Sequence, residues 1–267
     1  MLKPHRPLRV AVLCSHRAPG LMHLLNRAPD RGAAYEIVGC VTNQTTFDEQ
    51  VRVERRGVPI ASQPIGAFYA ARGAHDCRDM TLRAAYDTEL LARVEPWFPD
   101  IILLDGYLHL VTAPLLERFR HRVLNLHFSD LTLRTSTGAP RYPGIRAVRD
   151  ALAAGCSETR ATVHLVDEQA DGGPPIVRSR PFAVSPLVDE LRTQSDDRAF
   201  RAYAFAHEQW MLRTASGPLL AAAFGLVSSG AVDLDAAAIG DAPAGAPWLL
   251  ERGGVLTAPE FAFAHSR

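Results

Sequence analysis

Asn125 and His127 are the residues whose types and spacing point most directly to chemistry. They lie two positions apart in the apolar run VLNLHFS, residues 123–129, which is typical of a short buried strand. Because side chains alternate across a strand, both polar groups should point to the same face. An amide donor beside an imidazole can hold a developing oxyanion and move a proton. From the pair alone, a capped strand end with a hydrogen-bonded core histidine is an equally good interpretation.

Asp171 is the third candidate, in the acidic loop DEQADGGPP, residues 167–175. A carboxylate close to His127 would favour the protonated imidazole and fix its orientation. Asn125 and a charged His127 would then hold the oxyanion of a tetrahedral intermediate, while Asp171 helps to move a proton from the attacking amine to the leaving nitrogen. This combination predicts acyl transfer without a serine or cysteine nucleophile. The sequence alone does not place Asp171 near His127, and an acidic loop is more often a solvated turn.

Strands and helices alternate through the first half of the chain and would position these residues. Buried strands are expected at residues 8–14, 36–42 and 101–107, with a short edge strand at 58–60; helices are expected at 45–56, 79–94 and 112–119. The alternation predicts a parallel sheet. Asp105 lies near the carboxyl end of the strand at 101–107, and in open α/β sheets the carboxyl ends of the strands face the ligand crevice.

The second half of the chain is less regular. A polar, turn-rich insert follows at residues 130–140, then a helix that residues 141–145 open and that continues to about residue 153. Mixed or antiparallel strands are expected at 161–166 and 176–184, and a helical region at 187–214 that residues 218–224 continue or follow. Beyond Gly225 we expect loose turns and short surface strands anchored by Trp248 and Phe261. The predicted organisation is a catalytic domain, residues 1–225, with a C-terminal extension, residues 226–267, packed on it.

Composition narrows the classes of partner. Lysine plus arginine and aspartate plus glutamate number 29 each, so the overall charge gives no pull toward nucleic acid or acidic membranes. The four cysteines are isolated and show no C-x-x-C spacing, which favours reduced thiols over a disulfide framework or a metal site. No apolar run approaches a membrane span. We expect a soluble cytoplasmic protein, monomeric or homodimeric, with a small-molecule partner and no metal.

Three motifs in this order resemble the folate-dependent formyltransferases. They are Asn125-x-His127-x-Ser129, then Tyr-Pro-Gly at residues 142–144, and then HLVDEQADGGP at residues 164–174. The resemblance runs from about residue 8 to about residue 223 and is closest to the members that act on glycinamide ribonucleotide. It implies an α/β, Rossmann-like formyltransferase fold: a mostly parallel central sheet, helices on both faces and a short irregular C-terminal extension.

The resemblance implies an activity and a set of site residues. The activity is transfer of the formyl group of 10-formyltetrahydrofolate, the cosubstrate, to an amine. Asn125, His127 and Asp171 fall on the family's catalytic positions. The pterin and formyl group would enter a pocket made by two segments, in which His109 stands where an arginine is common. The implied folate-binding residues are Tyr107, Leu108, His109, Leu110, Val111, Val166, Asp167 and Ala170.

The implied acceptor site departs from the family in three places. Residues 15–20, SHRAPG, replace a Gly/Ser/Asn turn that cradles a substrate phosphate, although Arg17 could act as a charged clamp. Phe128 replaces a proline, and the loop after it is longer than usual. Asp105 stands where a small residue is common and could bind a cationic amine. The implied acceptor residues are Ser15, His16, Arg17, Asp105 and Glu208, the last being also compatible with a solvated helix glutamate.

These departures favour a specialised-pathway amine, with glycinamide ribonucleotide itself as the other acceptor. Within the family, a 10-formyltetrahydrofolate hydrolase remains an alternative, whereas methionyl-tRNA formyltransferases carry a larger basic C-terminal domain and a sugar-nucleotide formyltransferase has no positive support. From another class, a non-catalytic folate- or nucleotide-binding module is possible. A dinucleotide dehydrogenase is disfavoured because the first turn lacks G-x-G-x-x-G.

Overall fold

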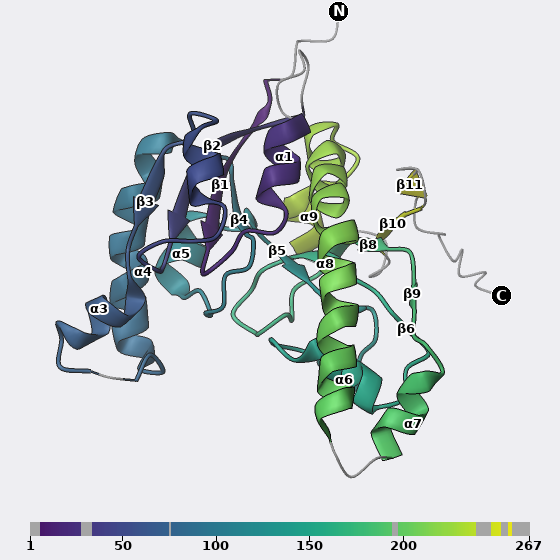
Figure 1. The fold of residues 1–267 in the computed structure, drawn as a ribbon. Helices are drawn as coiled ribbons and strands as arrows, with labels where there is room; N and C mark the ends of the chain where they lie inside the picture. The colour runs from purple at the N-terminus through teal and green to yellow at the C-terminus, as the bar shows by residue number, and fades with distance from the viewer. Residues whose placement is uncertain are drawn as a thin grey trace, which may run out of the picture.

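A nine-stranded sheet forms the centre of the protein in this computed structural model, which describes residues 6–27, 34–74, 76–193, 197–238, 247–251 and 256–257 (Figure 1). Its order is β11-β10-β8-β7-β5-β4-β1-β2-β3. The strands are β1 (Leu8–Cys14), β2 (Tyr35–Thr42), β3 (Ile60–Ser62), β4 (Ile101–Leu104), β5 (Val123–His127), β7 (Thr162–Leu165), β8 (Pro175–Ser179), β10 (Trp248–Leu250) and β11 (Leu256–Thr257). A separate small ladder pairs β6 (Glu158–Thr159) with β9 (Phe182–Ala183).

The first half of the sheet is parallel, as the alternation of strands and helices predicted. β3, β2, β1, β4 and β5 are all parallel neighbours. β7 runs antiparallel to β5, and β8 runs antiparallel to β7, which confirms the mixed or antiparallel strands expected there. β5 therefore lies at the boundary between the parallel and antiparallel parts of the sheet.

Helices cover both faces of the sheet, because the central strands are apolar on both sides. They are α1 (Leu21–Arg27), α2 (Gln50–Glu54), α3 (Ile65–Ala70), α4 (Met80–Val94), α5 (Ala113–Arg118), α6 (Ala147–Ala153), α7 (Leu187–Thr193), α8 (Asp197–Ser228) and α9 (Leu234–Ala238), with a 3-10 turn at Glu95–Trp97. Val10 and Val12 of β1 pack toward α1 and α8, whereas Ala11 and Leu13 pack toward α3, α4 and α5 (Figure 1). The Rossmann-like fold class is confirmed.

Helix α8 is long and apolar enough, by length and composition, to cross a membrane: its 18-residue window has a mean hydropathy of 1.2. Within the structure, 56% of that window is buried. The helix packs against α1, α6, α7 and β8, and Phe224 is completely buried. A core helix of a soluble protein has these same properties. The helix continues through Pro218, which confirms that residues 218–224 continue the helical region.

Several boundaries differ from those expected. The helix expected at 45–56 is only the short α2, and α3 was not expected, because its apolar stretch IGAFYA carries little periodicity. α6 begins at Ala147 instead of at residues 141–145, where Pro143 and Gly144 interrupt the backbone pattern. Leu234–Ala238 is helical, and β10 joins the sheet beside β8, so the described tail is more regular than expected. Phe261 lies outside the described residues.

Candidate active site

Strand β5 presents Asn125 and His127 on one face, as the alternation predicted. Leu124 and Leu126 pack toward α1 and α8, whereas Val123 packs toward α4 and α5 on the opposite side. Asn125 and His127 share the parity of Val123 and line one cavity of about 460 Å³. The two polar side chains therefore lie together at the end of a central strand.

His127 is fixed by contacts to both ring nitrogens. Its Nε2 is 3.0 Å from the carbonyl oxygen of Tyr142, and its Nδ1 is 3.5 Å from Oδ1 of Asp171. Because a carbonyl oxygen only accepts hydrogen bonds, Nε2 must carry the proton in the neutral ring. Nδ1 is then the nitrogen that can take up a further proton, on the side of Asp171.

Burial lowers the pKa of His127 below its usual value of 6.5, and this effect exceeds the opposing attraction of Asp171. The free protein therefore holds a neutral imidazole at neutral pH. The expectation of a charged donor rested on the Asp171 carboxylate, which does raise the pKa, and did not include the desolvation of a ring that is only 8% exposed. A neutral ring with a free Nδ1 can act as a base first and as a donor afterwards.

Asp171 reaches the pair from the loop after β7. Its Oδ2 accepts a hydrogen bond from the backbone N–H of Gly144 at 2.7 Å, and its Oδ1 accepts one from the amide of Asn125 at 3.4 Å. Burial raises the pKa of Asp171, but the contact with His164, the proximity of His127 and the Gly144 N–H outweigh it and hold the pKa at about 2. The carboxylate is thus ionised beside His127. Its φ of 55° is a left-handed conformation that aspartate tolerates better than most residues.

His164 is a site residue to which no role was assigned from the sequence, although it is the first residue of the motif at residues 164–174. It lies opposite Asn125 in the antiparallel pair of β5 and β7. Its Nδ1 donates to the carbonyl oxygen of Leu165 at 2.6 Å, so Nε2 is free to accept from the Asn125 amide at 3.1 Å. This contact orients the Asn125 nitrogen toward the cavity. The pairing register would have revealed it, but the sequence does not give that register.

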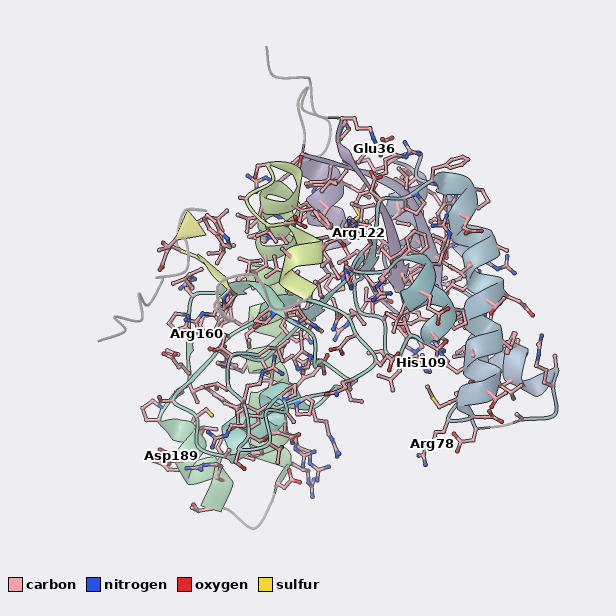
Figure 2. The ribbon with its side chains drawn as sticks, turned by 180° about the vertical axis from the view of Figure 1, so that it is seen from behind. Glu36, Arg78, His109, Arg122, Arg160 and Asp189 are labelled. Carbon is pink, nitrogen blue, oxygen red and sulfur yellow. The ribbon has the colours of Figure 1, made fainter. Side chains whose placement is uncertain are left out.

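The predicted site residues converge, with one exception. The cavity is lined by all three proposed catalytic residues, all eight proposed folate-binding residues, and His16, Arg17, Asp105 and Glu208. Ser15 does not line it: its buried hydroxyl accepts a hydrogen bond from the backbone N–H of Leu108 at 3.0 Å, which holds the folate segment instead. His109, in the segment between β4 and α5, is labelled in Figure 2.

Asp105 is the clearest change of role. It borders the cavity, but its side chain is completely buried and its oxygens accept hydrogen bonds from the backbone N–H groups of Gly20 and Leu21. Burial raises its pKa to about 7 against the effect of those two bonds. The expectation that it faces a cationic amine is corrected, because the carboxylate turns toward the start of α1.

The remaining polar groups at this end are His16, Arg17 and Glu208. Arg17 Nη1 donates to Oε1 of Gln209 at 3.4 Å, which ties the turn after β1 to α8. Burial raises the pKa of Glu208, and Arg17 opposes the shift. Glu208 is therefore a half-buried residue facing the cavity and not a solvated helix glutamate.

The folate segment, residues 107–111, is held from behind by Arg83 of α4. Arg83 is 1% exposed; its Nε donates to the carbonyl oxygen of Leu110 at 2.9 Å and its Nη2 to the hydroxyl of Tyr107 at 2.6 Å. Asp87, one helical turn on, lies 3.4 Å from Nη2 and accepts hydrogen bonds from the N–H and hydroxyl of Thr112. Thr112 thus binds α4, and its side chain does not cap α5.

We expect Arg83→Met to lower the free energy of unfolding by about 3–5 kcal/mol, because it leaves the buried Asp87 carboxylate without its cation. Urea denaturation followed by circular dichroism measures this change. The double variant Arg83→Met with Asp87→Asn should recover part of the loss, since no charge is then buried alone. Equal stability of the single and double variants would show that the ion pair does not account for the effect.

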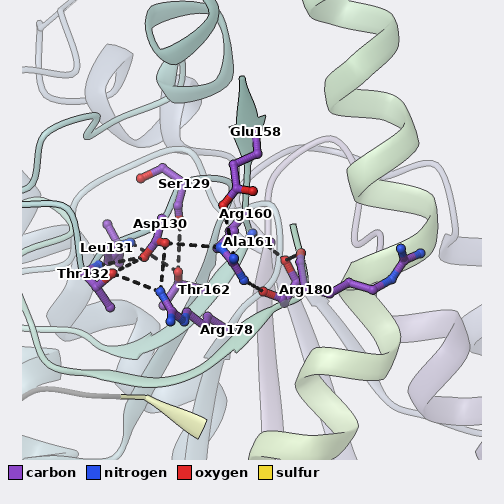
Figure 3. Close-up of polar contacts among 11 residues, drawn as sticks. Ser129, Asp130, Leu131, Thr132, Glu158, Arg160, Ala161, Thr162, Arg178 and Arg180 are labelled. Carbon is purple, nitrogen blue, oxygen red and sulfur yellow. Dashed lines mark hydrogen bonds and ion pairs between the residues drawn. The ribbon is translucent and has the colours of Figure 1, made fainter. Parts of the chain in front are cut away.

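The insert after β5 is anchored to the antiparallel strands and lies beside the cavity. Asp130 accepts a hydrogen bond from Arg178 at 3.0 Å and forms an ion pair with Arg160, and the hydroxyl of Thr162 donates to the carbonyl oxygen of Ser129 (Figure 3). Residues 134–140, all of them described, do not line the cavity. Arg134 does reach the aspartate loop, where it donates to the carbonyl oxygen of Gly172 at 3.2 Å. The insert therefore supports the loop that carries Asp171.

Metal ligands are not gathered at this site. Within the part of the chain that the structure describes, no group of three His, Cys, Asp or Glu side chains is arranged to hold a metal ion. The four cysteines are free thiols, and Cys14 and Cys40 are buried in the core.

The chain is similar to known formyltransferases in sequence and in fold. The sequence model of the family described as formyl transferase matches residues 8–200. The trifunctional purine biosynthetic protein adenosine-3 of Drosophila melanogaster is 30% identical over 217 residues, which are 80% of this chain but only 14% of that protein. The phosphoribosylglycinamide formyltransferase of Mycobacterium tuberculosis strain H37Rv is 33% identical over 189 residues, 70% of this chain and 76% of the relative.

Solved structures give the same result. The glycinamide ribonucleotide transformylase 1 of Symbiobacterium toebii superposes with a TM-score of 0.60 at 25% identity, over 84% of this chain and 89% of that one. A formyltetrahydrofolate deformylase from Pseudomonas syringae superposes with a TM-score of 0.59 at 22% identity, which shows the shared fold. The match of the family model, the identity to curated relatives and the arrangement of the cavity agree. The chain belongs to the formyl transferase family.

Proposed function

We propose that the protein is a 10-formyltetrahydrofolate-dependent N-formyltransferase that transfers the formyl group to a small-molecule amine. The observation that supports this most is the meeting of Asn125 and His127, from β5, with Asp171, from the loop after β7, at one wall of a single cavity. The folate would lie along residues 107–111 and the aspartate loop, where Val111 and Val166 supply apolar surface and backbone groups supply hydrogen bonds. The cosubstrate supplies an activated formyl group attached to nitrogen.

In the proposed mechanism, Asn125 stabilises the oxyanion. Its amide nitrogen carries two hydrogens, of which one points to His164 at 3.1 Å and the other makes only a long 3.4 Å contact with Asp171. The second hydrogen is the one available to the formyl oxygen as negative charge develops, because its present contact is long. A donor placed in advance in this way stabilises the tetrahedral intermediate more than the substrate.

His127 and Asp171 would handle the proton. When the amine attacks the formyl carbon, a C–N bond forms and the attacking nitrogen must lose a proton. His127 accepts it at Nδ1, and the ionised Asp171, 3.5 Å away, stabilises the resulting imidazolium. The proton then passes to the folate nitrogen as its bond to the formyl carbon breaks, directly or through water, which regenerates the neutral ring.

The acceptor is an amine of low molecular weight. The names of the curated relatives make glycinamide ribonucleotide one candidate, and an unphosphorylated amine is the other. We also propose that residues 1–225 form the catalytic domain with residues 226–267 packed on it, which the pairing of β10 with β8 supports. A cytoplasmic, monomeric or homodimeric protein without nucleic-acid or membrane partners fits this function.

The purified protein, 10-formyltetrahydrofolate and a panel of amines test the proposal. Tetrahydrofolate release is followed by absorbance, and the formylated product is identified by mass spectrometry. Amine-dependent release with matching product formation is the expected result. Formate release that needs no amine would favour the hydrolase, and folate binding without turnover for any amine would favour a binding module.

A further inference from the structure

Three backbone donors of the turn between β1 and α1 are already occupied by side chains of the same chain. The N–H of Ala18 donates to Oε2 of Glu49 at 2.8 Å. The N–H groups of Gly20 and Leu21 both donate to Oδ2 of Asp105 at 2.9 Å. Residue 19 between them is a proline and has no N–H. Two carboxylates thus fill the positions at the start of the helix where an external anion would be held.

This turn is where a phosphate would be expected to bind in such a fold. In open α/β sheets, ligand phosphates lie beyond the carboxyl ends of the strands and against the N–H groups at a helix start. Here the turn does line the cavity, through His16, Arg17 and Pro19. The position is therefore accessible from the cavity, but the N–H groups of Ala18, Gly20 and Leu21 are not free.

The packing keeps the turn in this arrangement. A Cβ atom at Gly20 would lie 2.4 Å from Cδ1 of Leu220, so the turn packs directly against α8 at this residue. Gly106 has a φ of 73°, and a Cβ atom there would lie 2.5 Å from the carbonyl oxygen of Arg17. The turn is held between β4 and α8. A phosphate could reach the N–H groups of Gly20 and Leu21 only by displacing the completely buried Asp105, which would then lose its hydrogen bonds to both.

We infer that the acceptor of this enzyme is a small amine that carries no phosphate group at the β1–α1 turn. This inference rests on the proposed formyl transfer and specifies its substrate class. At this end of the cavity, Arg17, His16 and Glu208 offer one cation, one imidazole and one carboxylate. Such a set suits an amine with neutral or carboxylate hydrogen-bonding groups.

A matched pair of acceptors tests the inference in turnover. Glycinamide ribonucleotide and its dephosphorylated ribonucleoside differ only by the phosphate. A phosphate held by charge-assisted hydrogen bonds changes kcat/KM by about 10- to 100-fold. We expect the two acceptors to differ by less than about threefold, or the ribonucleoside to be the better one. A preference for the ribonucleotide of about 30-fold or more would overturn the inference.

A binding measurement decides the question even if neither acceptor is formylated. The amide resonances of Ala18, Gly20 and Leu21 are followed by nuclear magnetic resonance while ribose 5-phosphate, ribose or inorganic phosphate is added. We expect no saturable shift at these amides in the wild-type protein. Saturable binding of ribose 5-phosphate but not of ribose, with shifts at these amides, would show that the turn does bind a phosphate and would refute the inference. Absence of turnover with every amine, beside this result, would count against the proposed function alone.

Variants that free the donors complete the test. Asp105→Ser releases the N–H groups of Gly20 and Leu21, and it should gain a saturable phosphate-dependent shift that the wild type lacks. Because Asp105 is buried, folding is checked by circular dichroism. Glu49→Gln, at a half-exposed position, weakens the bond to Ala18 only and should give a smaller gain. If well-folded Asp105→Ser binds no more phosphate than the wild type, then Asp105 is not the group that prevents phosphate from binding at the turn, and the argument from its hydrogen bonds fails.

Discussion

We expect His127→Ala to lower kcat by about 10²–10⁴-fold while changing folate affinity little, because general acid–base catalysis contributes a factor of that size. In the neutral imidazole Nδ1 carries no proton, and it lies 3.5 Å from the ionised carboxylate of Asp171. Burial lowers the pKa of the ring. Steady-state kinetics with the best amine measures kcat, and fluorescence titration with a folate analogue measures affinity.

The pH profile gives a second readout for His127. Since the neutral ring is the proposed base and its pKa lies below 6.5, wild-type kcat/KM should fall only as the pH drops below that value. The variant should lose this limb of the profile. His121→Ala is the matched control, because His121 contacts Asp235 and does not line the cavity. A His127→Ala enzyme as active as the control would remove His127 from the mechanism.

Asp171→Asn is the second variant with a large expected effect. The amide keeps the shape of the side chain and can still accept from the Gly144 N–H, but it cannot stabilise an imidazolium at His127. We expect kcat to fall by about 10²–10³-fold with folate binding largely retained. The exposed Asp76 provides a matched Asp→Asn control. Unchanged turnover in Asp171→Asn would exclude the proposed role of the carboxylate.

The same variant has a testable effect on stability. The pKa of Asp171 is depressed to about 2 in the folded protein, from a usual value of 3.8. A depressed carboxylate pKa stabilises the fold above the unfolded value, and this contribution is lost as the pH falls from about 4 to about 2. Asp171→Asn should therefore show a weaker dependence of its unfolding midpoint on pH in that window. Identical acid-unfolding curves for both proteins would contradict the assigned shift.

The sequence was most informative where a local pattern of apolar and polar residues defines a strand. Alternation along β5 was sufficient to place Asn125 and His127 on one face, and continuous apolar runs were sufficient to identify the buried parallel strands. The short helices α2 and α3 were misjudged because a few residues carry little periodicity. Local pattern thus predicted the strand that carries the site and most of the sheet.

What the sequence could not give depends on contacts between distant segments. Asp171 was placed beside His127 only by family resemblance, and nothing local indicated that His164 would face Asn125 across an antiparallel ladder. The roles of Asp105 and Ser15 were missed for the same reason: the side chains were identified, but their backbone partners lie more than eighty residues away in the chain. The direction of the His127 pKa shift required the burial, which only the fold supplies.

The position of β5 between a parallel and an antiparallel neighbour has a consequence for how the chain length can vary. One residue inserted into β7 would shift its register against β5 and turn His164 to the opposite face, away from Asn125. The segment 134–140 follows β5, yet it lies outside the cavity and reaches the aspartate loop through the contact from Arg134. Insertions and deletions should therefore be tolerated in that loop. In β7 they should not be tolerated, even at positions where single substitutions are.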